Sequence, residues 1–540
     1  METQMTSREK SAYLDNVDEL KKKKKKKKNK ATGQEAEEKT TPHNGTGPQG
    51  RRRRKKVAEQ EEEAQKKNEG IMERFHEEEI EEPVSPTGQY LTSSSLSVYI
   101  LGVLESEVPI DDSQTVPLLQ NLFLPINSRF SSIMIRDKNG EKKWKKVEVK
   151  LEDHIKVPTF PNGKSSNLFL YDEYLDEYMS TIAVEHLPQN RPLWELHIIK
   201  YPTSNAKGTL VFKLHHALGD GFSLMGALLS CMQRADNTSL PFTLPSSQRP
   251  KASSISNTKG FFKKLPSIFF QTISEFGWSF LKSKLIEDDQ TPIRSCAEDF
   301  KTRQMTISDV TFSLDLIKDV KSKLGVSIND VLAGVIFFGI RLYMQEINLK
   351  SSQTQSTALV LLNTRNIEGY KSVKEMIEKT NSRSAWGNQY AFLHVSIPEL
   401  SDSKYANPLE FIREAHKDMT KKKNSLATPL TGMLLDMLRK LRGPEAAASY
   451  LRSTLRNSST TISNIIGPVE QMAVANHPIK GFYFMVAGSP ESLTMTIMSY
   501  MGKIRIAFGV EKNFIDKQLF KSCLENSLEM IKEAAKKISA

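Results

Sequence analysis

The sequence predicts an α/β protein of more than one domain, preceded by a charged tail. Three observations carry this prediction. The chain has 540 residues, 38% of them hydrophobic, which is long enough for two or three domains. Strand-like and helix-like runs alternate along most of the chain, an arrangement typical of α/β folds. Residues 1–86, in contrast, contain few apolar side chains.

The first 86 residues form a separate charged segment. A lysine run at 21–28 and RRRRKK at 51–56 precede acidic clusters. Residues 1–56 hold 18 basic and 8 acidic residues, whereas residues 57–85 hold 3 and 11. So little apolar content predicts disorder. Because the two halves nearly cancel, most of the net charge of +12 falls on the rest of the chain, where it suits an anionic substrate or a membrane surface.

The basic half of the tail has three interpretations. It could bind anionic lipid head groups, at roughly 1 kcal/mol per basic residue near the surface. It could be a nuclear-localisation or nucleic-acid-binding arm, although no aromatic residues interleave with the basic runs. It could also be a solvated extension without a partner. The N-terminus has no apolar run, so no secretory signal is visible.

Residues 87–250 are predicted to form a first domain with a hairpin followed by a helix. Residues 192–200 and 209–214 are strand-like, and a turn-rich stretch separates them. A hairpin centred near Asn205 would place His216 opposite Trp194, within two residues. Residues 222–233 then read as an amphipathic helix, whose N-terminus Asp220 or Ser223 could cap.

The seven residues HHALGDG, from His215 to Gly221, lie between that strand and that helix. Glycine supplies the backbone freedom of a tight turn, and histidine readily takes a proton near neutral pH. Side chains alternate along a strand, so His215 and His216 cannot both face one site. On the pattern alone, an ordinary surface or core pair of histidines is the alternative.

Residues 251–300 are predicted to be a linker that contains an amphipathic helix at 260–281. Its regular part is expected to begin at Pro266, because proline fits the first helical turn. Charged residues interrupt the run, so we expect a helix in the membrane interface rather than a spanning one. A helix packed on the protein's own surface is the alternative. The apolar stripe comprises Phe262, Leu265, Phe269, Ile273, Phe276 and Phe280.

Residues 301–540 are predicted to form a second α/β domain. An apolar run after Asn329 contains Arg341 and is expected to be a core helix. The predicted strands are 357–362, 390–397, 460–465 and 493–510, the last a hairpin, and the predicted helices are 408–422, 433–442 and 517–539.

The three cysteines, Cys231, Cys296 and Cys523, are far apart in the sequence. Their sparse, odd number indicates reduced thiols and a protein that faces the cytosol. The sequence shows no cysteine or histidine spacing typical of a metal site and no phosphate-binding GxxxxGK[ST] loop. We therefore expect no metal.

HHALGDG, preceded by PLWE at 192–195, resembles the plant-type wax ester synthase/diacylglycerol acyltransferase family. SINDVLAG (327–334), NTRN (363–366), WGNQ (386–389) and SNIIGP (463–468) follow in the order of that family. The similarity extends from Leu91 to the C-terminus and leaves out the tail. It implies an α/β (α+β) fold of two chloramphenicol-acetyltransferase-like sandwich domains, with an active-site channel between them.

The resemblance also implies an acyl-CoA-dependent O-acyltransferase. A fatty acyl group would pass from acyl-CoA to a long-chain alcohol, giving a wax ester, or to diacylglycerol, giving triacylglycerol. His216 would be the catalytic general base, and His215, Asp220 and Gly221 would support it, Asp220 through an ion pair that braces the turn. No GxSxG nucleophile elbow follows a strand, so direct attack by the acceptor is the simplest mechanism. No cofactor is expected, because acyl-CoA is a co-substrate.

Six further residues are candidates for the substrate channel. The six are Trp194, Asn329, Asp330, Asn388, Ser463 and Asn464. Asn329 and Asp330 could instead cap a helix.

The expected partners are fatty acyl-CoA, the lipid acceptor and a membrane surface, without nucleic acid. The expected location is the cytosolic face of the endoplasmic reticulum membrane, with the plasma membrane as the alternative.

Two other functions stay open at this point. The same fold could act on a soluble alcohol or amine, although the DFGWG motif expected of such enzymes is missing and residues 481–490 read GFYFMVAGSP. A remote alternative is a nuclear protein that uses the basic tail.

Overall fold

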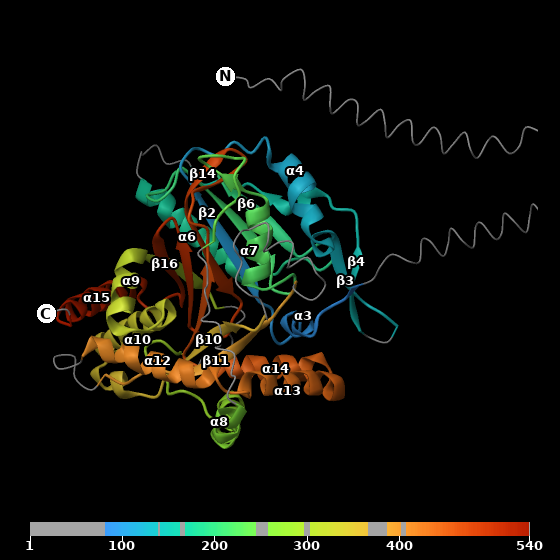
Figure 1. The fold of residues 1–540 in the computed structure, drawn as a ribbon. Helices are drawn as coiled ribbons and strands as arrows, with labels where there is room; N and C mark the ends of the chain where they lie inside the picture. The colour runs from blue at the N-terminus through green and yellow to red at the C-terminus, as the bar shows by residue number, and fades with distance from the viewer. Residues whose placement is uncertain are drawn as a thin grey trace, which may run out of the picture. The chain divides into compact units, whose positions relative to one another are not determined.

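The computed structural model describes residues 82–138, 141–161, 168–244, 258–295, 303–365, 386–400 and 407–538 (Figure 1). Contacts within the chain separate residues 1–79 from residues 80–540, and all the described residues belong to the second unit. The predicted disorder of the charged tail therefore concerns residues that lie almost entirely outside the described part.

In the described part, the first of two large sheets has the strand order β5-β6-β7-β2-β14-β13-β8. β6 and β7 form the predicted hairpin, and Trp194 pairs with Leu214, two residues from the expected partner. Every residue of β2, β6 and β7 is buried, so both faces of the sheet are covered. The strands are β2 (Tyr99–Ser106), β5 (Ile155–Lys156), β6 (Trp194–Ile199), β7 (Gly208–His215), β8 (Gln233–Arg234), β13 (Met472–Val474) and β14 (His477–Ala487).

Two helices, α6 (Leu168–Val184) and α7 (Gly221–Ser230), pack on the first sheet. A Cβ on Gly102 of β2 would meet Leu228 of α7 at 3.2 Å. Tyr99, three residues earlier and so on the opposite face, hydrogen-bonds to His186 just beyond α6. The two helices therefore cover opposite faces. Shorter helices near this sheet are α3 (Pro86–Leu91), α4 (Thr115–Leu118), α5 (Leu151–His154), η1 (Leu119–Phe123), η2 (Leu124–Ile126) and η3 (Ser128–Ser131).

Residues 82–86, assigned to the tail from the sequence, are part of the fold. β1 (Glu82–Pro83) joins β3 (Ser132–Arg136) and β4 (Lys142–Lys146) in a small sheet ordered β1-β4-β3. Val84 is buried in the first core, and Glu82 pairs with Arg129 at 2.6 Å. The predicted boundary was too late because one buried valine and one ion pair give no signal in composition.

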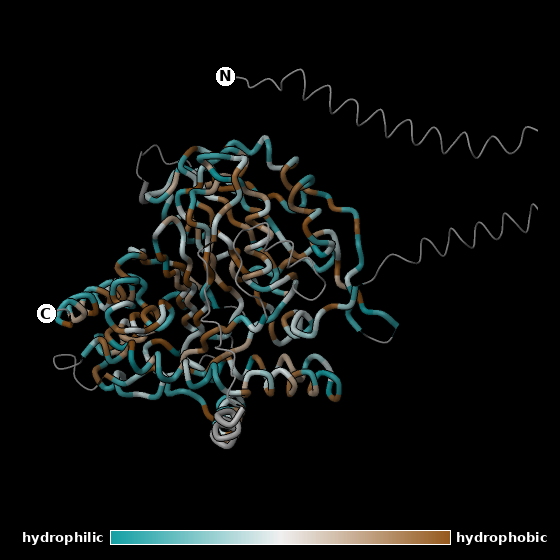
Figure 2. The backbone as a smooth tube through the Cα atoms, in the orientation of Figure 1, coloured by the Kyte–Doolittle hydropathy of each residue, from teal (hydrophilic) through white to brown (hydrophobic). Residues whose placement is uncertain are grey.

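The second large sheet has the order β11-β10-β12-β15-β16-β9. It confirms the strands and the hairpin predicted after residue 357. A layer of helices packs around α10 (Ile328–Ile347): α9 (Leu314–Leu324), α12 (Pro408–Lys423) and α15 (Lys517–Lys536). Hydrophobic residues gather along the strands, whereas the covering helices alternate in polarity (Figure 2). The strands are β9 (Met305–Ser313), β10 (Thr357–Asn363), β11 (Tyr390–Ser396), β12 (Thr460–Ile466), β15 (Leu493–Tyr500) and β16 (Lys503–Glu511), with η4 (Leu349–Gln353) before β10.

Helix α10 is long and apolar enough to cross a membrane, and among the described residues it is the one helix that meets this test. However, 78% of its apolar window is buried inside the protein. Arg341 is fully buried and donates hydrogen bonds to backbone carbonyls, among them those of Pro398 and Ile397. Helix α10 is therefore the central core helix that the sequence predicted.

The two sheets do not follow the predicted ranges 87–250 and 301–540. Strand β14 comes after β12 of the second sheet, yet it pairs with β2 of the first sheet along its length. The chain then returns to the second sheet through β15 and β16, which contact β14. A division by sequence position misses this exchange, because strand pairing over such a separation leaves no local pattern.

Three more helices lie together beside β10 and β11: α8 (Thr258–Lys284), α13 (Ala427–Arg442) and α14 (Pro444–Arg456). In Figure 1, α13 and α14 lie side by side, with α8 below them. Helix α8 begins at Thr258, eight residues before Pro266, so the predicted start was too late. Side chains of its first part lie outside the described set.

A largely buried ionic cluster joins the two sheets. Arg505 of β16 donates two hydrogen bonds to Glu105 of β2, at 2.6 and 2.8 Å, and two to Asp309 of β9. Its guanidinium also lies 4.2 Å from the ring centre of Tyr483 on β14. One side chain therefore holds four strands from both sheets.

We expect Arg505→Met to destabilise the protein by about 3 kcal/mol, because Glu105 would stay buried without its counter-charge. Chemical denaturation followed by circular dichroism measures this. Lys503→Met, on the exposed start of the same strand, should change the free energy of unfolding by less than about 0.5 kcal/mol. Equal stability of the two variants would contradict the cross-link.

Candidate active site

The HHxxxDG turn follows β7 directly and leads into α7. The amide of His215 donates to the carbonyl of Leu193, the residue before β6, and the amide of His216 donates to the carbonyl of Val98. Asp220 caps α7, since its carboxylate accepts from the amide of Ser223 at 3.0 Å. A Cβ on Gly221 would come within 2.4 Å of the Ile465 side chain on β12, so the turn lies close against the second sheet.

His216 is held by Asn388, which directly precedes Gln389 and β11. The Nδ1 of His216 lies 2.8 Å from the Oδ1 of Asn388, and the Asn388 amide donates to the backbone carbonyl of His216 at 2.8 Å. A carbonyl only accepts, so the Asn388 nitrogen must face it and Oδ1 must accept from His216. This network assigns the proton of neutral His216 to Nδ1 and leaves a lone pair on Nε2.

His215 points away from His216 and has the opposite hydrogen-bond pattern. Its Nδ1 accepts from the amide of Ala217 at 3.0 Å, so its proton lies on Nε2, 3.2 Å from the Ser97 hydroxyl. Ser97 in turn donates to Tyr99, which contacts His186 at 2.9 Å. Of the two histidines, only His216 therefore has an unprotonated ring nitrogen on the face opposite to His215.

A buried ion pair braces the turn. Arg365, two residues beyond β10, donates to both carboxylate oxygens of Asp220, at 2.6 and 2.9 Å. It also donates to the carbonyl of Gly387, and the amide of Gln389 donates to Asp220 at 3.0 Å. Asp220 therefore holds the segment that carries Asn388 and does not point at the face where His216 presents Nε2.

His216 lines a small cavity of about 50 Å³ between the two sheets. The ring of Tyr390 lies 5.5 Å from the His216 ring, centre to centre. Phe392 and Ser463 also line this cavity, together with apolar side chains such as Leu361 and Met495. The site is thus a basic nitrogen in a mostly apolar, enclosed space.

Comparisons with known proteins identify the family of this chain. Residues 138–332 match the wax ester synthase/diacylglycerol acyltransferase catalytic domain family, and residues 386–532 match the corresponding C-terminal domain family. The chain is 30% identical over 486 residues to wax ester synthase/diacylglycerol acyltransferase 4 of Arabidopsis thaliana, covering 85% of this chain and 92% of that protein. The chain belongs to the wax ester synthase/diacylglycerol acyltransferase family. It is an acyl-CoA-dependent O-acyltransferase.

Further similarities support the family and the fold. Wax ester synthase/diacylglycerol acyltransferase 3 of the same plant is also 30% identical, over 87% of this chain and 97% of its own length. Among solved structures, a wax ester synthase/diacylglycerol acyltransferase from Marinobacter aquaeolei VT8 aligns with a TM-score of 0.52 at 15% identity, covering 84% of this chain and 100% of that one. The starter condensation domain of rhizomide synthetase aligns with a TM-score of 0.50 at 10% identity, over 84% and 94%. The expected two-sheet acyltransferase fold is confirmed.

The acyltransferase structure brings two of the six channel candidates, Asn388 and Ser463, to His216. Asn464 faces the other side of β12 and donates to Asn329 at 2.8 Å. Asp330 forms a capping box with Ser327 at the start of α10, which is the alternative that the sequence left open. These three residues do not line the His216 cavity.

Trp194 is a core residue and not part of the channel. Its side chain is fully buried, stacks on His154 and donates to the carbonyl of Phe130 at 2.9 Å. The hairpin register places the backbone of Trp194 near the HHxxxDG turn. Its side chain nevertheless packs in the core, because side chains alternate between the two faces of β6.

Sequence reasoning missed Arg365, Tyr390 and Phe392. Arg365 lies within the quoted NTRN motif, and its charge was the one available signal for the partner of Asp220. Tyr390 and Phe392 lie two residues apart on β11 after WGNQ and share one face; the sequence predicted the strand but not that this face meets His216. The residues from 366 to 385, which include the end of NTRN, lie outside the described part.

Burial controls the charge of both histidines. It lowers the pKa of His216 below the usual 6.5, while the Asp220 carboxylate and the Asn388 hydrogen bond oppose that change. Burial lowers the pKa of His215 to about 3, with a smaller contribution from His216. Both imidazoles are therefore neutral at neutral pH, as a proton acceptor must be.

We expect the two adjacent histidines to be opposite tautomers at neutral pH. His216 should carry its proton on Nδ1 because Asn388 accepts there, and His215 on Nε2 because an amide occupies its Nδ1. Nitrogen-15 NMR of histidine-labelled protein distinguishes the two forms, with His216→Gln and His215→Gln assigning the signals. The same tautomer at both positions would contradict the described network.

Proposed function

We propose that this acyltransferase esterifies a long-chain alcohol or diacylglycerol with a fatty acyl group from acyl-CoA, and that His216 is its general base. One observation carries the proposal: Asn388 holds His216 in the tautomer that leaves Nε2 unprotonated, and His216 lines a mostly apolar cavity between the sheets. An apolar lining favours a lipid acceptor over a soluble alcohol or amine. The names of the family relatives agree with this substrate class.

In the proposed reaction, Nε2 of His216 takes the proton of the acceptor hydroxyl as its oxygen attacks the thioester carbonyl. The resulting tetrahedral intermediate collapses, the carbon–sulfur bond breaks, and the ester forms. The proton on Nε2 then passes to the coenzyme A sulfur, which restores neutral His216. General-base assistance of this kind contributes roughly 10²–10⁴-fold to the rate.

A direct transfer is favoured over an acyl-enzyme. Burial raises the pKa of Cys231 to about 12 and that of Cys523 to about 11, so neither thiol is an activated nucleophile at neutral pH. Cys296 lies outside the described residues. The reaction as proposed balances without a cofactor, since acyl-CoA supplies the acyl group and the leaving group.

A cavity of about 490 Å³ with many polar residues in its lining offers a place for the coenzyme A part of the donor. Its lining includes His186, Arg303 and serines of the 93–97 segment, a chemistry that suits an anionic, hydrogen-bonding ligand. Ser489 lines both this cavity and the His216 cavity. A thioester held there would have its acyl carbonyl near the base.

We further propose that the enzyme works on a membrane surface, at the cytosolic face of the endoplasmic reticulum. Its acceptors dissolve in bilayers, and the described part of the chain carries exposed apolar side chains on α8 and α13. Fluorescence imaging of the tagged protein, with and without residues 1–81, tests this location. Nuclear accumulation of the full-length protein would contradict it.

Replacing the base should abolish turnover. We expect His216→Ala to lower kcat for ester formation from radiolabelled acyl-CoA and a fatty alcohol by at least about 10²-fold. His416→Ala, which removes a half-exposed histidine paired with Asp330, is the matched control and should retain activity. Equal turnover by wild type and His216→Ala would show that His216 is not the base.

The pH profile should report the same residue. His216 becomes protonated and inactive only when the pH falls below its lowered pKa, so kcat/KM of the wild type should decline on the acid side with a midpoint below 6.5. Asn388→Asp keeps an acceptor for Nδ1 but adds a negative charge that stabilises the imidazolium. Its acid limb should therefore move to higher pH. An unchanged midpoint in Asn388→Asp would contradict the contact between the two side chains.

A further inference from the structure

Helix α8 has the reverse polarity of an ordinary surface helix over its described side chains. Thr272, Glu275 and Lys282 face the protein and are buried. Phe270 of α8 and Leu285, which directly follows the helix, are in contrast 77% and 73% exposed. A helix on a water-soluble surface normally buries its apolar face, so this arrangement indicates that α8 meets an apolar medium on its outside. The exposed apolar residues of α8 also include Ile273, Trp278, Phe280 and Leu281.

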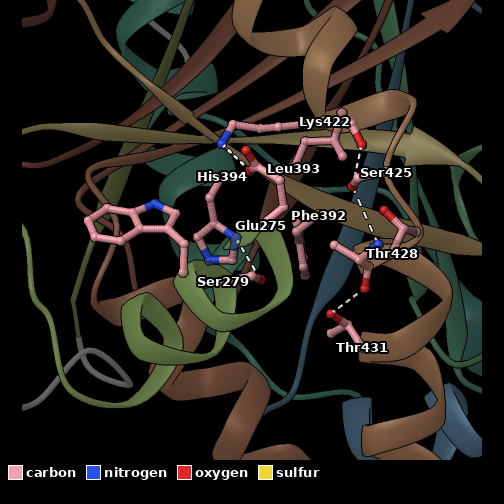
Figure 3. A pocket seen from close by; sticks show the side chains of 11 residues that line it. Glu275, Ser279, Phe392, Leu393, His394, Lys422, Ser425, Thr428 and Thr431 are labelled. Carbon is pink, nitrogen blue, oxygen red and sulfur yellow. Dashed lines mark hydrogen bonds and ion pairs between the residues drawn. The ribbon is translucent and has the colours of Figure 1, made fainter. Parts of the chain in front are cut away.

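Ionic and polar contacts hold the inner face of α8 in this orientation. Glu275 pairs with Lys422 of α12 at 2.9 Å, and Ser279 lies 3.2 Å from Nδ1 of His394 on β11 (Figure 3). Lys282 pairs with Asp288 at 2.5 Å, and both side chains are fully buried. Rotation of the helix would separate these buried charges from their partners. Its apolar side is therefore held outward.

Helix α13 extends the apolar surface, because it packs against α8. Met433 and Leu441 are 68% and 76% exposed, and Met437 is half exposed. Basic residues lie at the ends of the same helices: Lys284 follows the α8 aromatic residues, while Lys440 and Arg442 end α13, all three exposed. An apolar face with a basic margin is complementary to a bilayer that contains anionic lipids.

A cavity of about 410 Å³ lies beneath this surface. Ser283 of α8, Leu435 of α13 and Tyr450 of α14 line it, and most of its lining is apolar in character. Gly432 of α13 lines the cavity and is itself exposed, so the cavity reaches the surface there. Its size falls within the roughly 300–1,000 Å³ of small-molecule sites.

This cavity meets the His216 cavity at two aromatic side chains. Tyr390 and Phe392 each line both cavities. They lie two residues apart on β11 and so project from the same face of the strand. The cavity beneath the α8–α13 surface and the His216 cavity therefore share a wall that these two aromatic side chains form.

We propose that α8 and α13 form a portal through which the lipid acceptor passes from a bilayer to His216. Acyl-CoA does not use this portal, because its charged coenzyme A would have to cross an apolar cavity. The hydrocarbon chain of the acceptor occupies the 410 Å³ cavity while its hydroxyl reaches Nε2. This inference rests on the proposed reaction and adds the direction from which its acceptor comes.

The first test plugs the portal without disturbing the fold. A Cβ at Gly432 meets nothing within 4 Å, and glycine is a poor helix former, so Gly432→Trp should be tolerated. We expect it to lower kcat/KM for a long-chain alcohol by about 10-fold or more, with little change for a short, water-soluble alcohol and the same acyl-CoA. Gly277→Trp on α8 is the matched control, since that glycine is equally open but does not line the cavity.

The outcomes distinguish a failure of the portal proposal from a failure of the proposed reaction. If the wild type esterifies no acceptor, the proposed function fails. If the wild type is active and Gly432→Trp matches it on the long-chain alcohol, the portal is wrong. Equal losses on both alcohols, or an equal loss in Gly277→Trp, also overturn it.

The second test measures the membrane contact directly and needs no turnover. Co-sedimentation measures the affinity of the protein for vesicles of phosphatidylcholine and phosphatidylserine. We expect Met433→Ser/Leu441→Ser to lower this affinity about 10-fold. Val116→Ser/Leu122→Ser removes exposed apolar side chains, 42% and 48%, on α4 and η1 beside the first sheet and should bind like the wild type. Wild-type protein that does not bind vesicles, or equal binding by both double variants, would overturn the portal.

Discussion

The geometry of the candidate site depends on one buried ion pair, Asp220 with Arg365. The two side chains come from segments that follow strands of different sheets, 145 residues apart, and almost no solvent reaches them. Because a charge buried without its partner costs several kcal/mol, the pair holds the HHxxxDG turn against the segment that contains Gly387 and Asn388. The position of Asn388, and through it the orientation of His216, follows from that pairing. Asp220 is thus joined to the base through the backbone of a second segment.

Burial and one amide together prepare His216 for its proposed role. Burial keeps the imidazole neutral, and the Oδ1 of Asn388 draws its proton to Nδ1, which leaves Nε2 as the basic atom. His215 has the same residue type and the neighbouring position, but an amide and a serine fix it in the other tautomer on the other face. The difference between the two histidines therefore lies in their hydrogen-bond partners.

The polarity of α8 connects this chemistry to the source of the acceptor. In the sequence the helix shows an apolar stripe, which a core helix and an interfacial helix share. The structure shows that Glu275 and Lys282 face inward, whereas Phe270, Trp278 and Phe280 are exposed. The same helix thus contributes an apolar outer surface and, through Ser279 and Ser283, part of the cavity wall that leads toward His216.

The sequence by itself determined the elements that depend on neighbouring residues. Alternation and turn residues located the β6–β7 hairpin, helical periodicity located α10 and α12, and strand alternation separated His215 from His216. Only the tertiary structure decided that β14 joins the first sheet, that Trp194 is a core residue, that Arg365 pairs with Asp220, and that Tyr390 lies beside the base. These outcomes are contacts between segments far apart in the chain. Hydrophobic periodicity and backbone propensity act over a few residues, so they specify which element forms and not which distant side chain it meets.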